Sequence, residues 1–338
     1  MRFRKAVWMP GVFVVFVLAL TACGGSDATA TPVPTASVSS TANATSQDSA
    51  STAASDYLRE VLRAERSSLP IFQNFRTIIG QTYPLREALI DALLTAGVGT
   101  PFIEKTAILE ALDPPEEFLE DHQIWLAASR EQLRIDTEAA KAIEDGDLVR
   151  FSVLNGQLNG VDVTARISLS PVFCRNIGLA PQQLSICTPD ESALSGEYEV
   201  AINDLIRKFI PAFAVSQGKI GFRLSLTPEE LNQILSETAD GTRKLFQEFA
   251  AELETISPPD ELASDHDRLR TFFGRAIQIA TEVYRLGQDN DLEGASGELQ
   301  KLDPAFCDAR ASFEVQKFKD AVAIMFAGNE SACGGTPF

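Results

Sequence analysis

The fold of this chain follows from two stretches of its sequence, Asp113-Pro-Pro-Glu-Glu-Phe-Leu-Glu-Asp-His122 and Ser257-Pro-Pro-Asp-Glu-Leu-Ala-Ser-Asp-His266. Both contain a Pro-Pro pair and an Asp-His pair at the same spacing, and such matching marks indicate an internal duplication. Both also place a capping residue before a proline, with an acid at the third helical position. This pattern predicts helices that begin at Pro114 and Pro258. Thr227-Pro-Glu-Glu230 carries the same signal.

Further pairs of matching residues extend the duplication along the chain. Tyr57, Pro70 and Phe72 recur as Tyr198, Pro211 and Phe213; Leu109-Glu110 as Leu253-Glu254; Asp147-Leu148 as Asp291-Leu292; and Pro171-Val-Phe-Cys174 as Pro304-Ala-Phe-Cys307. The offset changes from 141 to 144 and then to 133, as insertions in loops would cause. We therefore predict two helical repeats, 56–190 and 191–338, each long enough to form a core of its own.

Apolar residues recur at spacings of three and four, the pattern of a helix with one buried face. The predicted helices cover 56–79, 84–112, 115–145 and 147–169 in the first repeat and 191–216, 227–256, 259–288 and 290–326 in the second. Lys219 to Leu226 alternates briefly and is expected to be a loop or a short strand. The predicted fold class is all-α, with two tandem antiparallel four-helix-bundle-like repeats. In its duplication this outline resembles imelysin-like and other duplicated helical lipoproteins of the bacterial surface.

The N-terminal residues have the features of an export signal. Three basic residues precede an apolar run over 6–20, which as a helix would reach roughly 22 Å and fall short of a bilayer core of roughly 30 Å. The run ends in Leu20-Thr21-Ala22-Cys23, which resembles the lipobox of bacterial lipoproteins. The resemblance implies that 1–22 is a lipoprotein signal peptide and that Cys23 is lipidated and anchors the chain to a membrane. An ordinary secretory signal with an unrelated cysteine is the alternative.

Residues 23–55 combine the predicted lipidated Cys23 with a segment of Gly, Ser, Thr and Ala that has no apolar periodicity. Such a composition buries too little apolar surface to fold, so this segment is predicted to be a disordered tether. The predicted location of the folded part is extracytoplasmic, at the bacterial cell membrane.

The charge of the chain limits its partners. Removal of the predicted signal would leave 26 Lys and Arg against 47 Asp and Glu, a formal charge of −21. This acidity argues against nucleic acid as a partner, because nucleic-acid binding depends on cationic side chains. Solubility explains the charge most simply. Cation binding is the functional interpretation.

Four cysteines remain besides Cys23, and an even number in an exported chain favours disulfides. Three pairings are possible. We prefer Cys174–Cys187 and Cys307–Cys333, because each bridge then lies within one repeat. A metal site for these thiols is the alternative, although the chain has no Cys-x-x-Cys spacing.

The two histidines of the chain, His122 and His266, occupy the same position in both repeats. Apolar residues four before and three after each histidine turn it toward the bundle interior or its rim. In one interpretation the imidazole is a buried structural group. In the other it binds a metal ion or a small ligand, with an acid from another helix. The adjacent acids Asp121 and Asp265 point about 100° away around the helix, so neither is placed to share a ligand with its histidine.

No sequence pattern of a known catalytic or nucleotide-binding site is present. The sequence therefore favours a non-enzymatic, lipid-anchored binding or scaffold module of the cell envelope without a cofactor, whose partner is an unknown protein or small ligand. A groove between the repeats is one expected binding place. The alternatives are a metal-ion-capturing lipoprotein that uses acidic residues with His122 and His266, and a purely structural envelope component.

Overall fold

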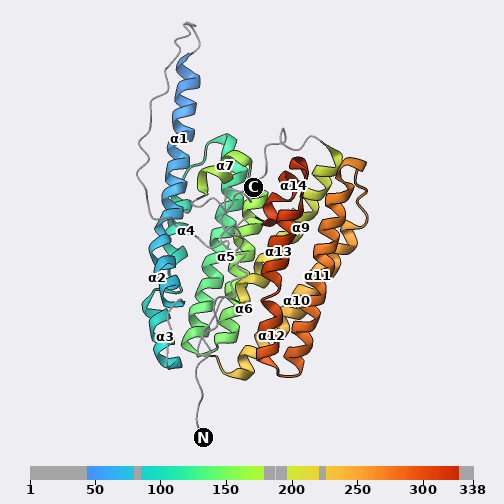
Figure 1. The fold of residues 1–338 in the computed structure, drawn as a ribbon. Helices are drawn as coiled ribbons and strands as arrows, with labels where there is room; N and C mark the ends of the chain where they lie inside the picture. The colour runs from blue at the N-terminus through green and yellow to red at the C-terminus, as the bar shows by residue number, and fades with distance from the viewer. Residues whose placement is uncertain (1–43, 80–84, 179–186, 188–195, 221–225, 327–338) are drawn as a thin grey trace, which may run out of the picture.

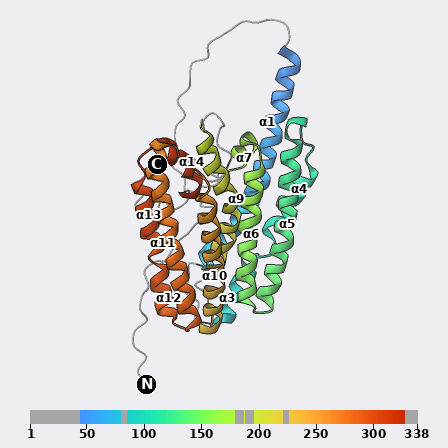
Figure 2. The same ribbon diagram turned by 90° about the vertical axis from the view of Figure 1, so that its right-hand side faces the viewer.

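The computed structural model describes residues 44–79, 85–178, 187, 196–220 and 226–326. Within these ranges every regular element is a helix, so the predicted all-α class is confirmed. Most helices run up and down along one direction and form an elongated body (Figures 1 and 2). No described helix is both long enough and apolar enough to cross a membrane.

The helices fall into two successive sets. The first set contains α1 (Ala44–Ser67), α2 (Leu69–Ile79), α3 (Arg86–Thr95), α4 (Pro101–Ala111), the 3₁₀ turn η1 (Glu116–Phe118), α5 (Leu119–Glu144), α6 (Leu148–Ser168) and α7 (Pro171–Ile177). The second set contains α9 (Glu197–Ile220), α10 (Pro228–Leu253), the 3₁₀ turn η3 (Asp260–Leu262), α11 (Ala263–Gln288), α12 (Leu292–Leu299), α13 (Leu302–Ser312) and α14 (Gln316–Phe326). We call these sets the first half and the second half. The predicted boundary between repeats lies outside the described residues, and of the predicted loop over 219–226 the first two residues end α9.

The capping signals have mixed outcomes. Thr227 and Glu230 form the predicted capping box at the start of α10. At the Pro-Pro pairs the prediction was wrong, because the helical turns begin only after Pro115 and Pro259, which are extended. The helical region is disfavoured for a residue that precedes a proline, so the first proline of each pair is a poor first residue of a helix.

Three predicted helices are interrupted, each shortly before a proline. α1 and α2 divide before Pro70, α3 and α4 before Pro101, and α12 and α13 before Pro304. A proline inside a helix clashes with the carbonyl of the residue four before it, which explains the breaks. Pro211 is the exception, because α9 continues through it. The last predicted helix also divides between α13 and α14, where Phe313 is extended.

The start of α1 corrects the predicted tether. The helix begins at Ala44, so the prediction of disorder up to residue 55 was wrong for 44–55. Alanine is the best helix former, and a short polar segment can extend an existing amphipathic helix without forming a new nucleus. The N-terminal part of α1 projects beyond the other helices (Figure 1). The segment 23–43 lies outside the described residues.

The apolar core differs between the halves. In the second half one continuous cluster extends from Tyr198 to Met325. In the first half the buried apolar residues form two separate clusters, one around Trp125 and one around Ile135. A layer of buried polar side chains around Lys105 and Gln132 accompanies this division.

The seam between the halves is formed mainly by α6 and α9, which pack along one another. The two helices approach closely at Gly160, where an added Cβ would lie 2.4 Å from Val215 Cγ2. Val163 of α6 belongs to the core of the second half. Helix packing thus fills the part of the seam where the sequence analysis expected a binding groove.

Candidate functional site

Each histidine of the chain forms a hydrogen bond with a tyrosine of the first helix in its half. The Tyr57 hydroxyl lies 2.8 Å from His122 Nδ1, and the Tyr198 hydroxyl lies 2.8 Å from His266 Nδ1. All four side chains are buried. Both tyrosines recur in the sequence, but their pairing with the histidines was not predicted, because α1 and α5 are far apart along the chain. Their shared recurrence was the available signal.

Burial keeps both members of each pair neutral. Burial lowers the pKa of His122 and of His266, because the charged imidazolium loses hydration. Burial also raises the pKa of both tyrosines, and the neighbouring carboxylates Asp121 and Asp265 raise it further. A neutral imidazole has one acceptor nitrogen, so the tyrosine donates to Nδ1 when the ring proton is on Nε2. The arrangement fits the structural interpretation of the histidines.

The acids beside the histidines, Asp121 and Asp265, accept hydrogen bonds from the residues that follow α6 and α13. Asp121 accepts hydrogen bonds from the Ser170 backbone N–H at 2.7 Å and from its hydroxyl at 2.6 Å. Asp265 accepts from the backbone N–H groups of Glu314 at 3.0 Å and Val315 at 2.8 Å. Each carboxylate therefore fixes a short C-terminal helix, α7 or α14, over its Tyr–His pair.

These contacts correct one match of the sequence analysis. Residue 170 takes the structural place of residues 314–315, so the offset here is 144 or 145 and does not fall to 133. Pro171–Cys174 and Pro304–Cys307 lie on different elements, α7 and α13, and their likeness does not mark equivalent positions. The turns before α6 and α12 support the offset of 144, because Gly146 and Asn290 both have positive φ.

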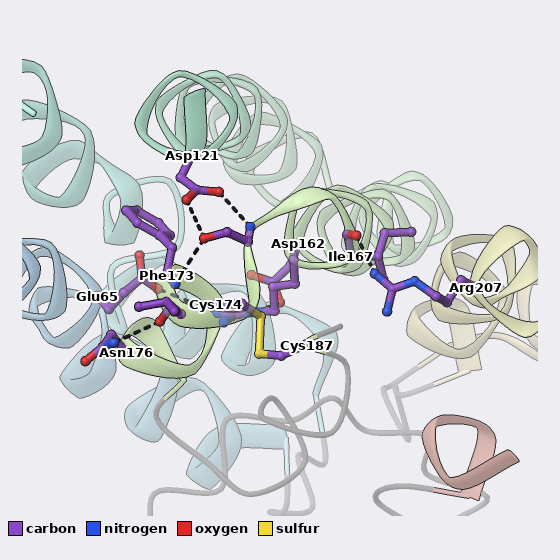
Figure 3. The surroundings of a disulfide bond; sticks show 12 residues. Glu65, Asp121, Asp162, Ile167, Phe173, Cys174, Asn176, Cys187 and Arg207 are labelled. Carbon is purple, nitrogen blue, oxygen red and sulfur yellow. Dashed lines mark hydrogen bonds and ion pairs between the residues drawn. A yellow bond between two sulfur atoms is a disulfide. The ribbon is translucent and has the colours of Figure 1, made fainter. Parts of the chain in front are cut away.

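The cysteine predictions have separate outcomes. Cys174 and Cys187 form the predicted disulfide, with a Cα–Cα distance of 5.5 Å. Both residues are buried beside the end of the first half that contains Asp121 (Figure 3). Cys307 lies on α13. Its predicted partner Cys333 and the predicted lipidation site Cys23 lie outside the described residues, so these two assignments stay predictions.

A group of buried charged side chains in the first half was not predicted. Glu65 Oε1 accepts from Trp125 Nε1 at 2.8 Å and pairs with Lys105 Nζ at 2.9 Å. The Lys105 ammonium also donates to Gln132 at 3.2 Å and lies 4.3 Å from the centroid of the Trp125 ring. Glu65 and Lys105 are both almost completely buried, at 4% and 2% exposed. A buried ion pair of this kind is weak evidence for stability, because removing both charges from water is costly.

Arg166 of α6 extends this buried group toward the surface. Its Nη2 lies 3.8 Å from Glu65 Oε2, and its Nε donates to Asp162 at 2.9 Å. Its guanidinium also stacks on Trp125, 4.8 Å from the ring centroid. Trp125 therefore contacts two cations, and such contacts are favoured by the negative face of the indole.

At three of the corresponding positions the second half has apolar residues. At the offsets given by the tyrosines and histidines, Ile206 replaces Glu65, Phe249 replaces Lys105 and Leu269 replaces Trp125. These three residues are buried in the continuous core of the second half. The helical arrangement is thus compatible with apolar residues in place of the Glu65–Lys105 ion pair. Arg166 differs, because its counterpart at the offset of 144, Arg310, is also a buried arginine.

The geometry around the histidines also bears on their interpretation as metal ligands. Among the residues that the structure describes, no three His, Cys, Asp or Glu side chains lie close enough to hold a metal ion together. The structure brings His122 to Tyr57 and His266 to Tyr198.

Comparison with known proteins adds no family: no family model, no curated protein and no solved structure matches this chain.

Proposed function

We propose that this chain is a lipid-anchored protein of the bacterial cell envelope, held outside the cytoplasm, whose helical body binds a partner or ligand and does not catalyse a reaction. The main support for a lipid anchor is the order of signals at the N-terminus, where a short apolar run leads into Leu20-Thr21-Ala22-Cys23. The projecting start of α1 supports it, because chain that leaves an anchor would reach the body through a helix standing clear of the other helices (Figure 2).

The state of the histidines supports a non-catalytic role. Histidine is the side chain best suited to general acid–base catalysis near neutral pH. Here His122 and His266 are buried, bonded to tyrosines and kept neutral. Rigid packing around a disulfide is the kind of scaffold on which a binding surface is held in place.

Lipid attachment is tested by feeding bacteria that express the full chain with an alkyne-tagged fatty acid. We expect the purified protein to carry the label and Cys23→Ser to lose it. The matched control is the double variant Cys174→Ala and Cys187→Ala, which removes the disulfide and leaves Cys23 in place. Label that persists in Cys23→Ser, or is absent from the unaltered chain, refutes the anchor.

Metal capture by acidic residues with His122 and His266 is the rival proposal, and a purely structural envelope component is the third. A ligand at about 100 times its dissociation constant adds roughly 2.7 kcal/mol to the stability of the folded state. Thermal melts with calcium, zinc, copper and iron salts therefore separate metal capture from the other two proposals. A shift that disappears in His122→Gln or His266→Gln establishes metal capture, and our proposal expects no such histidine-dependent shift.

A further inference from the structure

A cleft of about 580 Å³ opens at the end of the second half that contains Tyr198. It lies between the start of α9, the turn that joins α10 to α11, and the first turn of α14. Its apolar lining includes Tyr198, Ile256 and the prolines of the turn, Pro258 and Pro259. Clefts that bind small molecules commonly have volumes of roughly 300–1,000 Å³.

The charges of this cleft are mainly negative. Among the described residues, its lining contains three acids, Glu197, Glu199 and Glu261, and one cation, Lys317. Glu199 is only 5% exposed, and none of the hydrogen bonds or ion pairs found among the described residues involves its carboxylate. Glu199 stands in the first turn of α9, where the helix dipole favours an acid, and its carboxylate has no cation paired with it among the described residues.

The first half shows that the fold does not require these charges. Glu199 follows Tyr198, and the residue that follows Tyr57 is Leu58. The counterpart of Lys317 in the first half is found through its neighbour Phe318, whose ring lies 6.3 Å from that of Tyr198.

The same contact recurs in the first half, where the Phe173 ring lies 6.3 Å from that of Tyr57. Val172 is therefore the counterpart of Lys317. The second half thus has an acid and a base at two positions where its twin has apolar residues.

We propose that this cleft binds a small organic dication, a diamine with an aliphatic chain between two primary ammonium groups. Three carboxylates and one ammonium give the cleft a net charge of −2, which two ammonium groups balance. Ile256, Pro258 and the Tyr198 ring offer an apolar surface for the methylene groups between them. Glu199 is the principal ligand residue, because its carboxylate is the most deeply buried acid of the cleft. This inference rests on the proposed binding role and names a ligand class for it.

The test is calorimetric titration of the purified full chain with 1,5-diaminopentane, with calcium chloride as a second titrant. We expect saturable binding of one diamine, weakened at least tenfold by Glu199→Gln and severalfold by Glu261→Gln. Glu117→Gln is the matched control, because Glu117 is the counterpart of Glu261 in the first half and is also exposed. It removes the same charge from the chain and is expected to leave the affinity unchanged.

Three results overturn the proposal: no saturable heat at millimolar diamine, equal weakening by Glu117→Gln and Glu261→Gln, or calcium binding as tight as diamine binding. The last two show a general attraction of cations to an acidic surface. Circular dichroism of each variant establishes that the helices are intact, and Glu199→Gln keeps the size of the side chain. Fatty-acid labelling is independent of this titration, so a failure of the cleft and a failure of the anchor are distinguishable.

Discussion

Replacing Lys105 by Met gives the sharpest test of the buried charged group. The substitution keeps an unbranched chain of similar length and removes the ammonium that lies 2.9 Å from Glu65 Oε1. Glu65 then keeps the Trp125 N–H and the more distant Arg166, 3.8 Å away, inside a region almost closed to water. Breaking one partner of a buried ion pair typically costs about 3–5 kcal/mol, because the remaining charge has lost its hydration. We expect a loss of that size in the free energy of unfolding.

The control for this prediction is Lys208→Met, which removes the ammonium 2.7 Å from Glu252 in an exposed pair with side chains 61% and 42% accessible. Exposed pairs contribute about 1 kcal/mol or less. Urea unfolding followed by circular dichroism measures both variants, with the slope against urea checked for constancy. Adding Glu65→Gln to Lys105→Met removes the uncompensated charge and is expected to restore part of the loss. Equal costs for the two lysine variants would refute the reasoning.

Three further predictions concern single groups. Burial raises the pKa of Asp136 from 3.8 to about 7. Between these pH values the folded chain keeps a proton that the unfolded chain releases. The free energy of unfolding therefore falls as the pH rises from about 4 to about 7. Asp136→Asn is expected to remove up to about 4 kcal/mol of that fall in urea unfolding across this pH range, and an unchanged pH profile contradicts the assignment. Tyr198→Phe removes the hydroxyl bonded to His266 and is expected to cost about 1–3 kcal/mol in a thermal melt, whereas a cost near zero shows that the pair contributes no net stability. Replacing both Cys174 and Cys187 by Ala is expected to cost about 3 kcal/mol, measured by urea unfolding, and no loss would show that the bridge does not constrain the unfolded chain.

Local signals were sufficient for several features of this protein. The spacing of apolar residues predicted α5, α6, α10 and α11 to within a few residues, because one buried face imposes a regular period on a helix. The capping box at Thr227 and the Cys174–Cys187 bridge also followed from residues close together in the sequence. Such features depend on neighbouring residues, so a single sequence contains the information that they need.

Only the tertiary structure decided the features that depend on distant contacts. Pro70 and Pro211 are equivalent in sequence, yet the helix breaks before one and continues through the other. Lys105 gave no sign of burial, since a lysine on a helix is ordinarily solvated. The sequence by itself determined the helices, the predicted export signal and the likeness of the two halves. The partners of the histidines, the buried ion pair and the cleft beside Tyr198 were decided by how helices far apart in the chain pack together.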